Sequence, residues 1–187
     1  YLSHSGQMKG QFGYGITLFA EDEFYKNILF EDNYGLEISF EKSFSKSISF
    51  DIKPKFGTEI IRVDAPYQAR NTGIAFGIEL KPSDEFKLNF RMDQSKSIRF
   101  ENDEVVYFDM IARARFEYQA ATFLNFRLVA QYHRYYDTFD IQPLISYQPG
   151  PFSIFYFGTS RTYDTSFPGW KESYGQIYLK VQKLFSF

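Results

Sequence analysis

The sequence predicts an all-β chain, an antiparallel up-and-down β-barrel of about ten strands. Polar and apolar residues alternate with a period of two along most of the 187 residues, as they do in strands with two unlike faces. Aromatic residues make up 21% of the chain, with 23 Phe and 15 Tyr, and such rings pack well in sheets. Short turns alternate with longer polar connections, which is typical of successive hairpins joined in a barrel.

Ten segments carry the alternation. They are residues 7–20, 33–41, 47–60, 72–81, 86–95, 105–118, 123–136, 141–147, 152–163 and 173–187. The apolar faces carry Ile16, Ile38, Ile52, Phe76, Phe90, Phe108, Phe126 and, in the last segment, Ile177. In 152–163 the run Phe155-Tyr156-Phe157 makes both faces apolar, so this pattern leaves the register of that strand open.

The expected connections fall into two classes. Short turns occur at 42–46, 82–85, 119–122 and 148–151, where Pro, Ser, Asp and Gly supply turn residues. Longer or more polar loops occur at 21–32, 61–71, 96–104, 137–140 and 164–172. Barrels of the bacterial outer membrane have short periplasmic turns and longer outer loops, so the pattern predicts that orientation.

The composition excludes several classes of protein. The net charge is −2 and the isoelectric point is about 5.8, so no basic footprint for nucleic acid is visible. Cysteine is absent, which excludes disulfides, zinc–thiolate sites and thiol nucleophiles. The mean hydropathy is −0.37, and no run of twenty apolar residues exists to form a transmembrane helix. We expect no cofactor and no metal.

Full charges occupy the middle of the polar faces. The set comprises Arg91, Asp93, Asp109, Arg113, Arg115, Glu117 and Arg127. Packed inside a dry soluble core, such charges would cost several kcal/mol each. Two interpretations remain: a soluble β-domain with solvated charges, or a membrane barrel whose apolar face meets lipid and whose charges line the lumen.

Four features favour the membrane barrel. The strands are long enough for a tilted span of about 9–11 residues. The apolar faces are nearly free of charge at mid-strand, the loop lengths alternate, and the chain ends on Phe187, as outer-membrane barrels often do. Tyr and Phe also gather near strand ends, as interfacial girdles require. We expect one domain, residues 1–187, in a bacterial outer membrane, with lipid and lipopolysaccharide as its surroundings.

An even number of strands places both termini on the periplasmic side. The chain starts at Tyr1 without Met, so we expect either a complete ten-stranded barrel or the C-terminal ten strands of a larger one.

The segment from Gln142 to Gly158, QPLISYQPGPFSIFYFG, resembles a known family, and 126–132 and 176–187 fit the same resemblance. The family consists of Gram-negative envelope proteins that carry a family-9-like carbohydrate-binding domain ahead of an outer-membrane β-barrel. The resemblance covers about the last third of the chain. It implies location and architecture, because the family's own function is uncharacterised, and the sugar-binding domain is missing here.

Three functions are compatible with these residues. The first is a non-enzymatic structural or interaction component whose outer loops contact envelope proteins or glycans, with Tyr135, Tyr136, Phe139 and Trp170 as candidate contacts. The second is a narrow anion channel through the arginine-lined lumen. The third is a hydrolase at the barrel rim, with His133 near Asp137 and Asp140 as a general base. We expect the first, because small barrels are filled by side chains.

Overall fold

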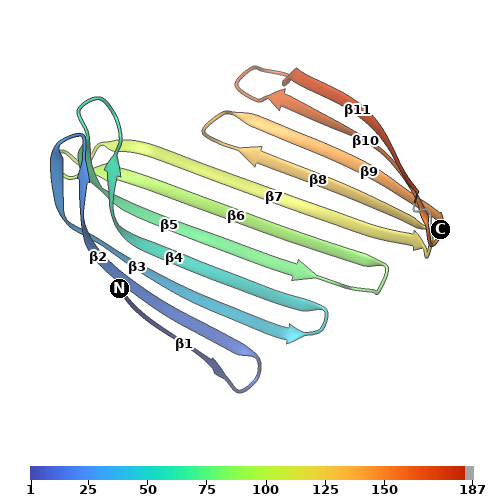
Figure 1. Cartoon of the computed structure of the whole chain (residues 1–187), viewed down its shortest axis with the longest axis horizontal. Coiled ribbons are helices and arrows are strands. Elements are labelled where there is room, and N and C mark those ends of the chain that lie inside the picture. The colour runs from blue at the N-terminus through green and yellow to red at the C-terminus, as the bar shows by residue number, and fades with distance from the viewer. Residues whose placement is uncertain (184–187) are drawn as a thin grey trace. The chain divides into compact units, whose positions relative to one another are not determined.

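The computed structural model describes residues 1–183 as strands joined by turns and loops (Figure 1). The strands are β1 (Leu2–Met8), β2 (Phe12–Tyr25), β3 (Ile28–Ser45), β4 (Ile48–Ile61), β5 (Tyr67–Leu80), β6 (Phe86–Arg99), β7 (Val105–Ala121), β8 (Leu124–His133), β9 (Thr138–Gly150), β10 (Ser153–Asp164) and β11 (Lys171–Lys183). They form one sheet in chain order, from β1 to β11. The predicted terminal signal at Phe187 lies outside the described residues.

The all-β, antiparallel, up-and-down prediction is confirmed. The strand count of ten is wrong, because residues 1–183 form eleven strands. β1 and β11 are the two edges of the strand order, so the described sheet is not closed into a barrel. Within these residues no helix is long and apolar enough to cross a membrane.

The extra strand β1 lies mostly before the predicted segment 7–20, which contains its last two residues and the turn that follows it. Met8 pairs with Phe12 across a turn at residues 9–11, in which Gly10 and Gln11 have φ values of +83° and +58°. Glycine adopts such angles readily, and a hairpin turn requires them. An odd number of turn residues between two paired residues keeps the period of two in phase, so the alternation runs through the turn without a break. The even-number argument for both termini therefore fails.

The predicted loop 21–32 is also wrong. β2 and β3 continue through it as a hairpin that closes with a two-residue turn at Lys26 and Asn27, both with positive φ. This is the twist-matched turn that hairpins prefer. A bulge between Glu21 and Glu23 leaves Asp22, Glu31 and Asp32 out of the ladder and lets pairing resume beyond them.

The chain divides into two compact units, which are described separately. Unit 1 comprises residues 1–78 and 92–110, and unit 2 comprises residues 79–91 and 111–187, of which the structure describes those up to 183.

In unit 1 the register places the alternating apolar residues of β1 to β4 on one face. Leu18 pairs with Leu36, and Leu36 with Phe56, so the pleat puts them on the same side. These side chains remain open: Leu18 is 43% exposed and Phe56 48%. Along β3 the apolar band runs from Tyr34 to Phe40. Lys42 follows it on the same face, and its ammonium reaches back to the carbonyl of Gly10 at 2.5 Å.

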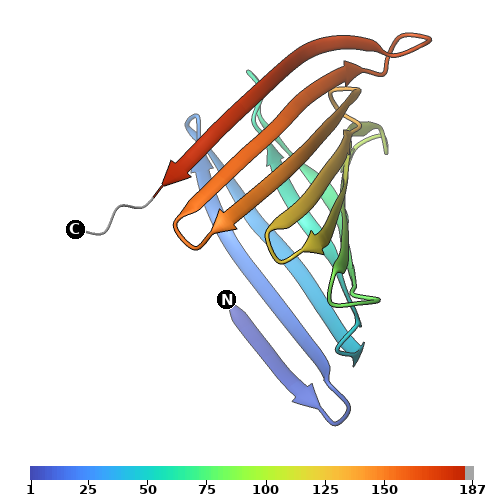
Figure 2. The ribbon, with the colours of Figure 1, turned by 90° about the vertical axis from the view of Figure 1, so that its right-hand side faces the viewer.

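Unit 2 has the same organisation. The apolar face of β9 starts at Phe139 and ends at Tyr147, with Ile141, Pro143 and Ile145 between them. β9, β10 and β11 lie side by side (Figure 2), and the apolar face continues onto β11. Here Ile177 is 67% and Leu179 71% exposed. The sequence predicted this face for β11.

On the polar face of unit 1, the backbones of β3 and β4 approach each other closely. Gly35 and Gly57 are register partners in β3 and β4, and a Cβ on Gly57 would overlap the carbonyl oxygen of Tyr34 and lie 2.8 Å from Cα of Gly35. No side chain larger than hydrogen fits at Gly57 unless the two strands move apart.

Substitution Gly57→Ala is expected to lower the free energy of unfolding by about 1–3 kcal/mol, because the added methyl group must displace the backbone of β3. Denaturant titration measures the change. Gly150→Ala is the matched control, since a Cβ there meets nothing within 4 Å. An equal response of both variants would contradict the close approach.

Candidate functional site

Four of the predicted lumen residues share one face of unit 2. Arg113 pairs with Gln131, and Glu117 pairs with Arg127, across β7 and β8. Arg115 is two residues from Glu117 on the same strand and donates to Glu117 Oε1 through Nε at 3.1 Å and Nη2 at 2.5 Å. The structure thus places Glu117 between two arginines, which is the arrangement of a charge network.

The other predicted charges are divided between the units. Arg91 belongs to unit 2, whereas Asp93 and Asp109 belong to unit 1. Asp109 accepts hydrogen bonds from the hydroxyl of Tyr107 at 3.2 Å and from the backbone N–H of Met110 at 2.8 Å. This carboxylate is therefore already held by its own strand.

One acidic group absent from the predicted set also forms a compensated cluster. Glu79, at the end of β5, pairs with Lys81 at 2.9 Å and with Lys87 on β6 at 3.0 Å. The two ammonium groups share its two carboxylate oxygens. Compensation of this kind recurs on the polar face of unit 2.

The four predicted loop aromatics fall into two groups. Tyr136 lies 4.6 Å from the ring of His133 and 5.2 Å from Tyr135, measured between ring centroids. Trp170 instead packs on Phe139, with centroids 5.1 Å apart. The loops carrying them are joined, because Thr165 donates to the carbonyl of Asp137 through both N–H and hydroxyl.

The two groups belong to different faces. Phe139 pairs with Tyr132 on β8 and with Tyr163 on β10, so three aromatic residues form a row on the apolar face. His133 pairs with Thr138 and so belongs to the polar face. Trp170 therefore extends the aromatic row of the apolar face, while Tyr136 packs against His133 on the polar face.

The predicted general base has an aromatic neighbour. The ring of Tyr136 packs beside that of His133, and the carboxylate of Asp140 accepts a hydrogen bond of 2.5 Å from Thr162. Asp137 lies in the loop, with its carbonyl bound by Thr165. Among residues 1–183 no cluster of three or more His, Cys, Asp or Glu could hold a metal ion.

A buried polar network in unit 1 was not foreseen. Ser97 is 0% exposed, and its hydroxyl donates to Glu59. The amide of Asn71 donates to Glu59 at 2.9 Å and lies 3.1 Å from the hydroxyls of Ser95 and Ser97. Neutral donors from β5 and β6 thus satisfy one carboxylate on β4. Only the register brings these residues together, so no local pattern along the chain could signal the network.

The loops of unit 1 are joined by cations. Arg62 binds both carboxylate oxygens of Glu23, at 2.8 and 3.0 Å, and lies over the ring of Tyr25. Arg99 lies 4.1 Å from the ring centroid of Tyr67. Lys26 reaches the carbonyl of Val63 at 3.1 Å.

A further set of contacts joins β5 to the β6–β7 loop. Arg70 on β5 pairs with Asp103 of that loop and lies over the ring of Phe100. The hairpins β2–β3, β4–β5 and β6–β7 therefore form one packed end of unit 1.

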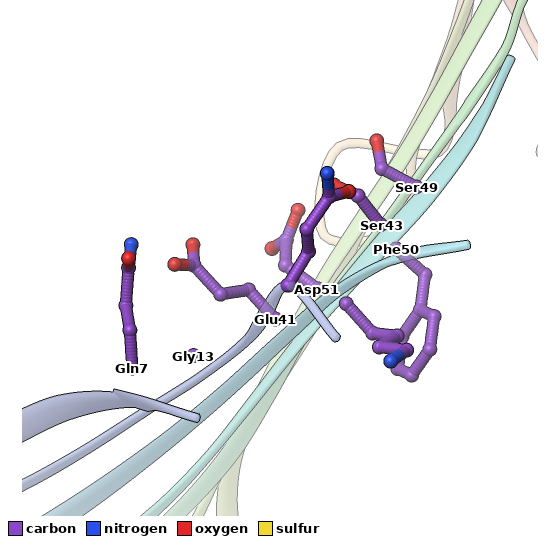
Figure 3. Close-up of a pocket in the computed structure, with 9 residues that line it drawn as sticks. Gln7, Gly13, Glu41, Ser43, Ser49, Phe50 and Asp51 are labelled. Atoms are coloured by element: carbon purple, nitrogen blue, oxygen red, sulfur yellow. The ribbon is translucent and has the colours of Figure 1, made fainter. Parts of the chain in front are cut away.

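A hollow at the opposite, turn end of unit 1 is lined by polar groups (Figure 3). The carboxylates of Glu41 and Asp51, which are register partners, rise on the same side as Gln7, while the ring of Phe50 points to the other side. Gly13 leaves room for Glu41, because a Cβ there would overlap its carboxylate. Polar and apolar side chains are therefore separated between the two faces at this end too.

Comparison of the chain with protein-family models, with curated proteins and with solved structures found no match in any of the three. The resemblance to the envelope family therefore stays a prediction.

Substitution Ser97→Ala is expected to cost about 1–3 kcal/mol of unfolding free energy, because the half-buried Glu59 loses the hydrogen bond from a fully buried donor. Ser3→Ala is the control: Ser3 is exposed, and its hydroxyl contacts that of Thr17 at 3.3 Å. The change is read from denaturant midpoints. A Ser97→Ala midpoint equal to that of Ser3→Ala would show that the network adds nothing to stability.

Proposed function

We propose that the chain is an integral β-barrel protein of the bacterial outer membrane, a non-enzymatic structural or interaction component whose apolar face contacts lipid. The observation that carries the proposal is the uncovered apolar face of both units, together with the row of Tyr132, Phe139 and Tyr163 that bounds it in unit 2. Contiguous apolar surface of this extent is costly in water and favourable in hydrocarbon.

The width of the apolar band supports this proposal. The band spans eight residue steps on β9, from 139 to 147, and six on β3, from 34 to 40. At about 3.4 Å per residue, these are about 27 Å and about 20 Å along the strand. A tilt of about 40° reduces them to roughly 21 Å and 16 Å across the membrane, which fits within the apolar band of about 25 Å in known barrels.

The polar face supports the same conclusion. Arg115 with Glu117, and Glu79 with Lys81 and Lys87, are compensated pairs that can be enclosed in a lumen with few uncompensated charges. Compensation also favours a filled interior over a selective pore, because an anion channel needs arginines that remain available to the ion.

The proposed orientation follows from the connections. In unit 2, the end with the connections 134–137 and 165–170 faces outward. It carries Tyr135 and Tyr136, which are exposed and available to envelope proteins or glycans. The end with the short turns faces the periplasm. Both exposed rings have an apolar body and a polar hydroxyl, which suits contact with amphipathic partners.

The membrane proposal is tested by a pair of neighbouring residues on β11. In a bilayer, Ile177→Arg is expected to destabilise the protein by about 2–4 kcal/mol, because the charge enters hydrocarbon near the middle of the band. Gln176→Arg places the same charge on the polar face and is expected to be near neutral. Unfolding is measured by urea titration in phosphatidylcholine vesicles.

Insertion decides between the membrane barrel and the soluble alternative. A soluble domain that packs its apolar face into a core would also be destabilised by Ile177→Arg, but it would not insert into vesicles. If the apolar face stood open in water, both substitutions would change stability by less than about 0.5 kcal/mol. Equal stability of the two variants, or failure of the wild-type protein to insert into vesicles, would refute the membrane proposal.

The interior is tested by conductance. In planar bilayers the protein is expected to give no steady unitary current, since its lumen is filled by paired side chains. Steady currents that disappear in Arg113→Ala, but persist in Lys9→Ala at the β1–β2 turn, would instead establish the anion channel.

A further inference from the structure

Arg161 lies on the apolar face of unit 2. Its register partners are Ile141 on β9 and Gly175 on β11. The residues two positions away on the same face are Thr159 and Tyr163. A guanidinium on this face requires a polar partner, because the surface around it is apolar.

In the proposed membrane, Arg161 lies at the depth of the interface between hydrocarbon and headgroups. It is two residues, or about 7 Å along the strand, inside Tyr163, which belongs to the aromatic row formed with Phe139. Long cationic side chains at this depth extend toward the headgroups while their aliphatic stems stay among apolar neighbours. The aromatic pair of Phe139 and Trp170 lies in the row just outward of it.

A single acidic side chain orients the guanidinium. Glu172 Oε2 lies 2.9 Å from Arg161 Nη1, and Glu172 folds over Gly175, where a Cβ would overlap its carboxylate. Arginine has five N–H donors, and this contact uses one. The side chains of both residues are partly open, Arg161 being 44% exposed.

We propose that Arg161 binds the phosphate of a phosphorylated glycolipid in the outer leaflet. This inference rests on the proposed membrane function and names a lipid site on it. The remaining N–H groups match phosphate oxygens, for which arginine is well suited. The exposed ring of Trp170 offers an apolar surface for the rest of the glycolipid. Because Arg161 lies on the face proposed to contact lipid, we expect a lipid phosphate there and not a free anion.

The test uses the full chain in phosphatidylcholine vesicles that contain either lipid A or phosphatidylglycerol at equal total phosphate. After gentle detergent extraction, native mass spectrometry counts the lipid that remains bound. The wild type is expected to retain lipid A in preference to phosphatidylglycerol. Arg161→Gln is expected to reduce retention about tenfold, as the loss of one charge-assisted interaction implies. Lys180→Gln, which removes a charge from the polar face of the same hairpin, is expected to retain lipid as the wild type does.

Glu172→Gln separates a lipid site from a structural ion pair. It leaves Arg161 charged and removes a competing carboxylate, so lipid A retention is expected to stay at least as high as in the wild type. Equal losses in Arg161→Gln and Glu172→Gln would show that the pair is structural and overturn the proposal.

Other outcomes also decide the question. Unchanged retention in Arg161→Gln, equal loss in Lys180→Gln, equal retention of phosphatidylglycerol, or displacement of lipid A by inorganic phosphate would each overturn the glycolipid site. Insertion into pure phosphatidylcholine is scored separately, so the lipid site can fail while the membrane proposal stands.

Discussion

Backbone pairing between antiparallel strands is the constraint on which the other features depend. Because successive side chains point to opposite faces, a given register assigns every residue of a strand to one side, and a slip of one residue exchanges the two sides. The ladders of unit 1 and unit 2 hold the apolar residues on one face over several consecutive strands. The segregation of charge from apolar surface is therefore a property of the hydrogen-bonded register and needs no core beneath the sheet.

The segregation gives each face its own means of stabilisation. On the polar face, Glu59 is satisfied by Asn71 and Ser97, and Glu117 by Arg115. Such groups are held by direct partners and lose little when they are enclosed. The apolar face has no comparable partner among the described residues of its own unit, so its stability depends on the medium. We propose that this medium is lipid, and that in unit 2 the row of Tyr132, Phe139 and Tyr163 marks one edge of it.

The sequence predicted strand content, the apolar face of each clear strand and the common face of Arg113, Arg115, Glu117 and Arg127, because these follow from a period of two. It missed the turn at 9–11, since an odd turn preserves the phase of the alternation. It also missed the β2–β3 hairpin, because acidic residues are usually depleted in strands.

Features that depend on pairing could not be read from one strand at a time. The network around Ser97 joins positions up to 38 residues apart. The face of Arg161 was hidden by the run from Phe155 to Phe157, whose alternation fits either side. The partners of Arg161 on β9 and β11 resolve the ambiguity.

The edges of the sheet set the strongest condition on the membrane proposal. Unpaired N–H and C=O groups cannot face hydrocarbon, so β1 and β11 must both be covered in a bilayer. In an antiparallel series of eleven strands the first and last run in the same direction, and a direct seam between them would be parallel. Antiparallel closure would require a further strand. The apolar residues of both edge strands, such as Leu2, Met8, Ile177 and Leu179, lie on the same face as those of their neighbours. Any strand that covers these edges must therefore present apolar residues to that face as well. Its sequence must alternate between apolar and polar residues, whichever segment or chain supplies it.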